Sequence, residues 1–117
     1  MVLSDRDIKK LLQAKKLIFQ PKLSHDQIGP ASIDLKLGDV FKYFNVTKQN
    51  LLDVKKGLPD SSFIVTYKCQ KDEAFILHPN YFVLASTREY VKVPADLVLR
   101  VEGKSTLARM GILVHTA

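Results

Sequence analysis

The chain has little cysteine and no long apolar run, and both absences narrow what it can be. Cys69 is the only cysteine among 117 residues, so an internal disulfide and a cysteine-rich zinc site are excluded. The first ten residues, MVLSDRDIKK, lack the apolar core of a signal peptide. No run approaches the length of a membrane span. We therefore expect a protein of a reducing, cytoplasmic setting that does not enter a membrane.

The residues of a zinc deaminase or of a hydrolase triad are not clustered in the sequence either. His25, His78 and His115 are scattered, and none is followed two positions later by glutamate. A zinc-dependent base deaminase needs such a glutamate beside its metal ligands, so we expect no catalytic zinc. His78 and His115 are interpreted as structural. A Ser-His-Asp triad stays open, although the chain has no Gly-x-Ser-x-Gly elbow.

The segment GKST at residues 103–106 ends like a P-loop but lacks the first glycine of that motif. A P-loop needs a glycine five positions before Gly103, so that the backbone can curl around a phosphate. Val98 stands there, within the extended apolar run LVLRVE. The sequence therefore excludes a P-loop nucleoside triphosphatase.

Positive charge is in excess, with 18 lysines and arginines against 12 acids and a net charge of +6. That sign fits an anionic partner, such as a nucleotide or a nucleic acid. The basic residues are dispersed in pairs such as Lys9-Lys10, which is typical of a solvated surface. A nucleic-acid interface needs a continuous basic face, so we do not expect nucleic acid as the partner.

The pattern of apolar residues predicts one domain over residues 1–117, with a helix followed by short strands. Ser4 is a suitable N-cap with Asp7 three residues later, and apolar residues then recur at helical spacing over residues 5 to 14 or 15. After this helix the chain favours an all-β barrel or sandwich. Strands are predicted at residues 17–21, 33–37, 40–44, 63–69, 97–102 and from 112 onward, and on both sides of a His-Pro-Asn turn within residues 73–94. A turn is predicted at Gly38-Asp39, a surface loop at residues 47–62 and one helical turn at residues 107–111.

Two cations and two hydroxyls, on Lys104, Ser105, Thr106 and Arg109, gather within six residues after the strand predicted at 97–102. Cations, hydroxyl donors and free backbone N–H groups are what a phosphate site is made of. Arg109 can grip two phosphate oxygens, whereas Lys104 acts as a point charge. On spacing alone, a polar turn with ordinary surface cations is an equally good interpretation.

Longer stretches resemble the dCTP deaminase and dUTPase superfamily, most closely its dCTP deaminase branch. LSDRDIKKLL is similar to the opening helix of that family, and IGPASIDLKLGDVF to its first strand motif. GKSTLARMG corresponds to the family's Gly-Arg-Ser-Ser-Leu-Ala-Arg-x-Gly. The resemblance covers essentially the whole chain.

The resemblance implies a mainly β fold, a distorted barrel of the dUTPase-like β-clip type with an N-terminal α-helix. It also implies a homo-oligomer, a trimer or a hexamer, with active sites at subunit interfaces. Magnesium would accompany the nucleoside triphosphate. The residues that would line the triphosphate site are Lys104, Ser105, Thr106, Leu107, Ala108 and Arg109.

Among these residues, the resemblance gives catalytic roles to Ser105, near the attacking water, and to Arg109. Lys104 stands where the family commonly has arginine. Lysine keeps the positive charge but lacks the guanidinium group that donates to two phosphate oxygens at once. Asp34 matches the acidic residue of the family's first motif, which would order magnesium through water. A structural turn acceptor is the alternative for Asp34.

The family reaction is hydrolytic deamination of dCTP to dUTP, with the triphosphate clamped by residues 104–109. The alternatives are a dUTP pyrophosphatase, alone or combined with deamination, and a non-catalytic nucleotide-binding relative. The resemblance places the next family motif and the general-base glutamate after Ala117. We therefore expect the 117 residues to be a fragment or a shortened relative, without deaminase activity of their own.

Overall fold

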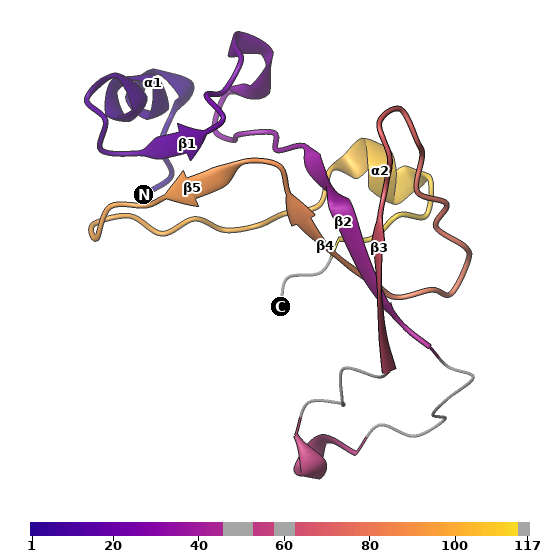
Figure 1. The fold of residues 1–117 in the computed structure, drawn as a ribbon. Coiled ribbons are helices and arrows are strands. Elements are labelled where there is room, and N and C mark those ends of the chain that lie inside the picture. Colours follow the sequence, from indigo (N-terminus) through magenta and orange to yellow (C-terminus); the bar gives the residue numbers. More distant parts are fainter. Residues whose placement is uncertain (46–52, 58–62, 115–117) are drawn as a thin grey trace.

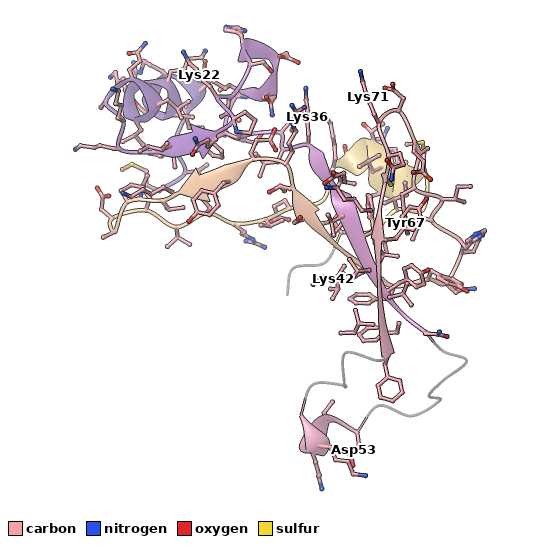
Figure 2. All side chains as sticks on the ribbon, in the orientation of Figure 1. Lys22, Lys36, Lys42, Asp53, Tyr67 and Lys71 are labelled. Atoms are coloured by element: carbon pink, nitrogen blue, oxygen red, sulfur yellow. The ribbon has the colours of Figure 1, made fainter. Side chains whose placement is uncertain are left out.

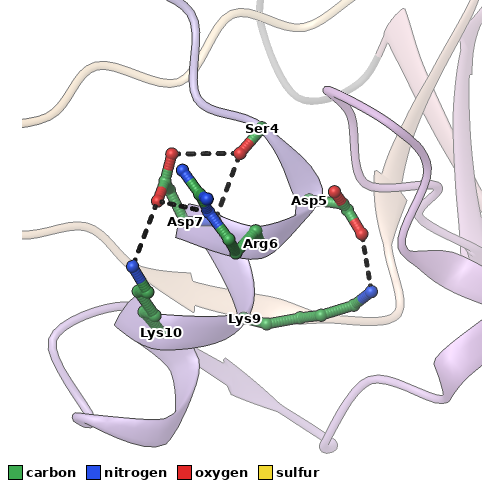
Figure 3. Close-up of polar contacts among 6 residues, drawn as sticks. All are labelled: Ser4, Asp5, Arg6, Asp7, Lys9 and Lys10. Carbon is green, nitrogen blue, oxygen red and sulfur yellow. Dashed lines mark hydrogen bonds and ion pairs between the residues drawn. The ribbon is translucent and has the colours of Figure 1, made fainter.

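The chain begins with a capped helix. A computed structural model describes residues 1–45, 53–57 and 63–114, and helix α1 spans Asp5–Gln13. The Ser4 hydroxyl oxygen accepts a hydrogen bond from the Asp7 N–H at 3.4 Å (Figure 3). The predicted helix is confirmed. It ends slightly earlier than expected because Lys15 adopts a left-handed conformation, with φ 54°.

Strands β1 (Ile18–Gln20) and β5 (Tyr90–Lys92) form a two-stranded antiparallel sheet near α1 (Figure 1). The apolar side chains of Ile8, Leu17 and Phe19 are buried. Burial of apolar surface is the main force that stabilises such packing. The short strand predicted at residues 17–21 is thereby confirmed.

A second sheet has three antiparallel strands in the order β3-β2-β4. Its central strand β2 spans Leu37–Phe44, and β3 (Ile64–Lys68) and β4 (Val83–Thr87) pair with its two edges. The strands predicted at residues 40–44 and 63–69 are confirmed, the first of them as part of a longer strand.

The prediction of a strand over residues 33–37, ended by a turn at Gly38-Asp39, is wrong. Strand β2 continues through both of these residues, whereas Ile33 forms only an isolated bridge. At Gly38 the backbone of β4 comes close, and an added Cβ would lie 3.3 Å from the Ser86 carbonyl oxygen. The glycine therefore admits a neighbouring strand and does not turn the chain.

Residues 73–77, predicted to form a strand before the His-Pro-Asn turn, are not in a strand. Phe75 instead stacks on Phe41 of β2, with ring centroids 4.2 Å apart. Aromatic packing thus holds this segment where a hydrogen-bond ladder was expected. Strands β4 and β5 both follow the turn.

Residues 97–114 contain helix α2 (Ser105–Arg109) and, as far as the structure describes them, no strand. The strands predicted at 97–102 and from 112 are therefore wrong for this part, and residues 115–117, which include His115, lie outside the described residues. The helical turn predicted at 107–111 is present but starts earlier. Large apolar side chains remain exposed here, Val98 to 93% and Leu113 to 84%.

The described part of the connection between β2 and β3 lies at the end of the molecule farthest from α1 (Figure 1). Its described residues, 53–57, contain the short 3-10 helix η2 (Val54–Lys56). Asp53, labelled in Figure 2, accepts a hydrogen bond from the Lys55 N–H at 3.0 Å. The remainder of the loop predicted at residues 47–62 lies outside the described residues.

The fold is mainly β with an N-terminal helix, as predicted, but its two sheets do not close into a barrel within the described residues. The radius of gyration is 17.3 Å, larger than the about 13 Å of a compact domain of this size. The open shape explains why few side chains are fully enclosed. Within the same residues, no helix has the length and apolar character needed to cross a membrane.

Candidate functional site

Helix α2 carries the cluster of cations and hydroxyls that the sequence singled out. Lys104 is its N-cap, with an extended backbone conformation, and Arg109 is its last residue. The N–H groups of Leu107 and Ala108 donate to the Lys104 carbonyl oxygen at 3.0 Å each. These two N–H groups are therefore used within the helix, so they are not available to a phosphate.

Among residues 104–109, all side chains but one are exposed to solvent. Leu107 is half-buried. Ser105 and Arg109 are four positions apart, and residues with this spacing lie on the same face of a helix. A hydroxyl and a guanidinium on one exposed face can donate hydrogen bonds to the same anion. The exposed residues of the segment are Lys104, Ser105, Thr106, Ala108 and Arg109.

Asp34, from the segment before β2, reaches α2 and forms an ion pair with Lys104. The distance from Lys104 Nζ to Asp34 Oδ2 is 2.5 Å, and both side chains are more than half exposed. The structure thus brings together two residues that the resemblance had placed in one site. An exposed ion pair stabilises a fold by about 1 kcal/mol or less, so this contact adds little to the stability of the chain.

The backbone of Asp34 is itself held on both sides by one residue, Gln27. The Asp34 N–H donates to the Gln27 carbonyl oxygen at 2.8 Å, and the Asp34 carbonyl oxygen accepts from Gln27 Nε2 at 2.9 Å. Gln27 ends the short 3-10 helix η1 (His25–Gln27) and is 7% exposed. Ser24 fixes the amide of Gln27, because its N–H and its hydroxyl both donate to Gln27 Oε1 at 3.1 and 3.0 Å.

Glu89, between β4 and β5, is a buried carboxylate in contact with this arrangement. It is 5% exposed, and its Oε1 accepts from Gln27 Nε2 at 2.8 Å. Its Oε2 accepts from the Lys36 N–H at 3.0 Å. Burial opposes ionisation, but the hydrogen bonds from Gln27 and from the backbone N–H of Lys36 outweigh it and lower the pKa of Glu89. The carboxylate therefore stays charged at neutral pH.

Sequence reasoning missed both Gln27 and Glu89. Glutamate and glutamine are residue types that usually lie on the surface, and Glu89 stands in the polar stretch STREY. Nothing in the local pattern distinguishes it from a solvated turn residue. Its burial depends on Gln27, whose side chain comes from 62 positions away.

Asp34 on its own does not make a site for a resident magnesium ion. Asp34 offers one carboxylate, and Lys104 already occupies one of its oxygens. Protein-bound magnesium commonly has one or two carboxylate ligands and takes its other oxygens from water and substrate phosphates. Among the described residues, no group of three or more histidine, cysteine or acidic side chains could hold a metal.

The other residues considered from the sequence lie outside this arrangement. His78 packs against Tyr81, with ring centroids 5.8 Å apart, which is a structural contact. Cys69 is half-buried. Burial raises the pKa of its thiol, and the negative charges of Glu73 and Asp39 raise it further. A thiol in such surroundings is a poor nucleophile at neutral pH.

A family model described as dCTP deaminase-like matches residues 2–117. The chain belongs to this dCTP deaminase-like family. The matched residues include both parts of the site, the segment around Asp34 and helix α2. The match confirms the resemblance seen in the sequence.

Individual relatives agree with the family match, and each of the three that follow is named "dCTP deaminase, dUMP-forming". A protein of Methanobrevibacter smithii is 44% identical over 114 residues, which cover 97% of this chain and 59% of the relative. One of Dictyoglomus turgidum is 43% identical over 116 residues, covering 98% and 59%. One of Nanoarchaeum equitans is 37% identical over 129 residues, covering 100% and 65%. This chain thus spans less than two thirds of the length of these relatives.

Proposed function

We propose that the protein acts in deoxyribonucleotide metabolism as a dCTP deaminase, and that helix α2 binds the triphosphate of its substrate. The observation that carries this proposal is the ion pair between Asp34 and Lys104 at the start of α2, in a chain of the dCTP deaminase-like family. Lys104 supplies a fixed positive charge there. Arg109 lies at the other end of α2. Its guanidinium group can donate two parallel hydrogen bonds to phosphate oxygens.

The chemistry assigned to this chain is binding and orientation. Hydrolytic deamination replaces the amino group at C4 of cytosine by oxygen from water and releases ammonia. The Ser105 hydroxyl can both donate and accept hydrogen bonds, so it is suited to orient that water. Fixing the triphosphate on α2 brings the base to one place relative to Ser105, and such positioning lowers the barrier of the chemical step.

We propose dUMP as the product, rather than the dUTP expected from the sequence. The support is that the relatives from M. smithii, D. turgidum and N. equitans are named dUMP-forming. This requires two waters. One enters at C4 and releases ammonia, and the other cleaves the bond between the α- and β-phosphates and releases pyrophosphate. Magnesium bound to the triphosphate neutralises part of its charge when the substrate binds.

We propose further that the protein is a cytoplasmic homo-oligomer, a trimer or a hexamer. The exposed apolar side chains of residues 97–114, such as Val98 and Leu113, support an association that covers them. Light scattering over a wide concentration range tests this. A protein that stays monomeric and still binds nucleotide would contradict shared sites.

The activity is tested by incubating the intact protein with dCTP and magnesium and separating the products by chromatography. We expect dUMP, pyrophosphate and ammonia in equal amounts. Accumulation of dUTP would identify a deaminase without phosphate cleavage. Conversion of dUTP but not of dCTP would identify a pyrophosphatase, and binding without any conversion would refute the enzymatic proposal.

A further inference from the structure

A polar network centred on the buried side chains of Gln27 and Glu89 connects two parts of the chain next to Asp34. Gln27 uses both hydrogens of its amide, one to Glu89 Oε1 at 2.8 Å and one to the Asp34 carbonyl oxygen at 2.9 Å. Its amide oxygen accepts from Ser24 at 3.0 Å. An amide with all of these partners has one orientation only.

The network leads from Glu89 to Lys104 in three contacts. Glu89 fixes the Gln27 amide, Gln27 fixes the backbone of Asp34, and the Asp34 carboxylate pairs with Lys104. We propose that Glu89 and Gln27 are positioning residues that hold the Asp34 carboxylate in place, and through it direct the Lys104 ammonium at the triphosphate. This inference rests on the proposed function of α2.

The physical need for the network lies in the exposure of the last contact. A lysine side chain has many rotamers and loses conformational entropy when it is held. An exposed ion pair retains a lysine only if its partner is already fixed, because the pair itself is weak. The contact between the buried Gln27 and Glu89 side chains is weakened less by water than an exposed pair is, so it supplies rigidity that the exposed pair lacks.

The change Glu89→Gln tests the idea with nearly unchanged shape. An amide at this place cannot accept from both Gln27 Nε2 and the Lys36 N–H without turning its own N–H groups toward one of these donors. The Gln27 amide, and with it Asp34, then loses its fixed place. We expect the dissociation constant for dCTP to rise roughly two- to five-fold, the effect of losing an exposed ion pair.

A double-mutant cycle separates positioning from a general loss of structure. Glu89→Gln and Lys104→Ala are measured singly and together, by titration calorimetry with dCTP on the intact protein. If Glu89 acts through Lys104, Glu89→Gln changes the dissociation constant only while Lys104 is present. An equal change in both backgrounds, or no change in either, would overturn the inference.

A second measurement works without nucleotide. Acetylation of lysines is followed by mass spectrometry in the wild-type protein and in Glu89→Gln. We expect Lys104 to react roughly two- to five-fold faster in the variant, while the exposed Lys55 of η2 reacts at the same rate in both. If the wild-type protein binds no dCTP, the proposed function fails, and the acetylation rate still decides whether Glu89 holds Lys104.

Two further variants guard against misfolding. Ser24→Ala removes the hydroxyl that donates to Gln27 Oε1 and that also lowers the pKa of Asp26 by a hydrogen bond, and it should raise the reactivity of Lys104 less than Glu89→Gln does. Glu73→Gln is a matched control, since Glu73 also accepts from one side chain, Tyr67, and one backbone N–H, that of Gln70. It should leave the reactivity of Lys104 unchanged. A response of Lys104 to Glu73→Gln as large as to Glu89→Gln would refute a specific network.

Discussion

Lys104 and Asp34 are 70 positions apart in the sequence, and their side chains meet in an ion pair of 2.5 Å. The sequence had suggested two roles for Asp34, ordering magnesium through water or accepting hydrogen bonds in a turn. The ion pair adds a third role, in which the Asp34 carboxylate orients a cation of the site. Only the magnesium role predicts that the effect of replacing Asp34 depends on magnesium.

Replacement of Asp34 distinguishes these roles. Asp34→Ala frees the Lys104 side chain, so we expect a weaker affinity for dCTP, by roughly two- to five-fold. Because the loss arises from Lys104, it should be the same with magnesium and with EDTA. Calorimetric titrations under both conditions provide the measurement. A loss seen only with magnesium would show that Asp34 acts through the ion.

Arg109 should contribute most to triphosphate binding. Removing a charged hydrogen-bond partner costs about 1.5–3 kcal/mol, so Arg109→Ala should weaken dCTP and dUTP binding by that amount, measured by isothermal titration. The affinity of Arg109→Lys should lie between those of the wild-type protein and Arg109→Ala, because lysine keeps the charge but cannot donate to two phosphate oxygens at once. Arg100→Ala is the control, since Arg100 is exposed and paired with Glu102. An Arg109→Ala protein that binds as tightly as this control would remove Arg109 from the site.

Acid should destabilise the fold partly through Glu89. The pKa of Glu89 is lowered in the folded protein, so its contribution is fully present above the unfolded pKa of about 4.3. It is lost as the pH falls through the lower folded value. The urea midpoint should therefore drop between about pH 5 and pH 3, and less steeply in Glu89→Gln. The drop will not vanish, because the pKa values of Asp5, Asp26 and Glu73 are also lowered. Equal slopes for both proteins would contradict the assignment.

The cap of α1 offers a test of local stability away from the site. Ser4→Ala removes the oxygen that accepts from the Asp7 N–H, and loss of such a cap typically costs about 1 kcal/mol of unfolding free energy. Lys9→Ala removes only the exposed ion pair with Asp5 (Figure 3) and should cost less. Denaturant titrations measure both variants, and the reverse order would argue against the cap as the dominant contact.

Elements defined by neighbouring residues could be predicted from the sequence, whereas those that depend on distant partners could not. The cap at Ser4 and the helical spacing after it are local, and α1 was found. Whether Gly38 turns the chain or admits a strand depends on Ser86 of β4, which comes much later. Residues 73–77 have the apolar content of a strand, but Phe75 stacks on Phe41.

The site follows the same division. The cations and hydroxyls of residues 104–109 stand together in the sequence, so the cluster was visible before the structure. The ion pair of Lys104 with Asp34 follows from the course of the chain around β2, and neither the local sequence pattern nor the resemblance predicted it. The burial of Glu89 could not be predicted, because charged residues usually lie on the surface. Its hydrogen bond with Gln27, a distant residue in the sequence, is what allows it to be buried.

The surroundings of Cys69 have a practical consequence for spectroscopy. Because the only thiol of the chain is half-buried and has a raised pKa, maleimide reagents should modify it slowly at neutral pH. The change Lys55→Cys in η2, at the end of the molecule farthest from α1 (Figure 1), would then supply a single fast-reacting thiol. A fluorophore attached there would mark one defined position of the chain and leave both Cys69 and α2 unmodified.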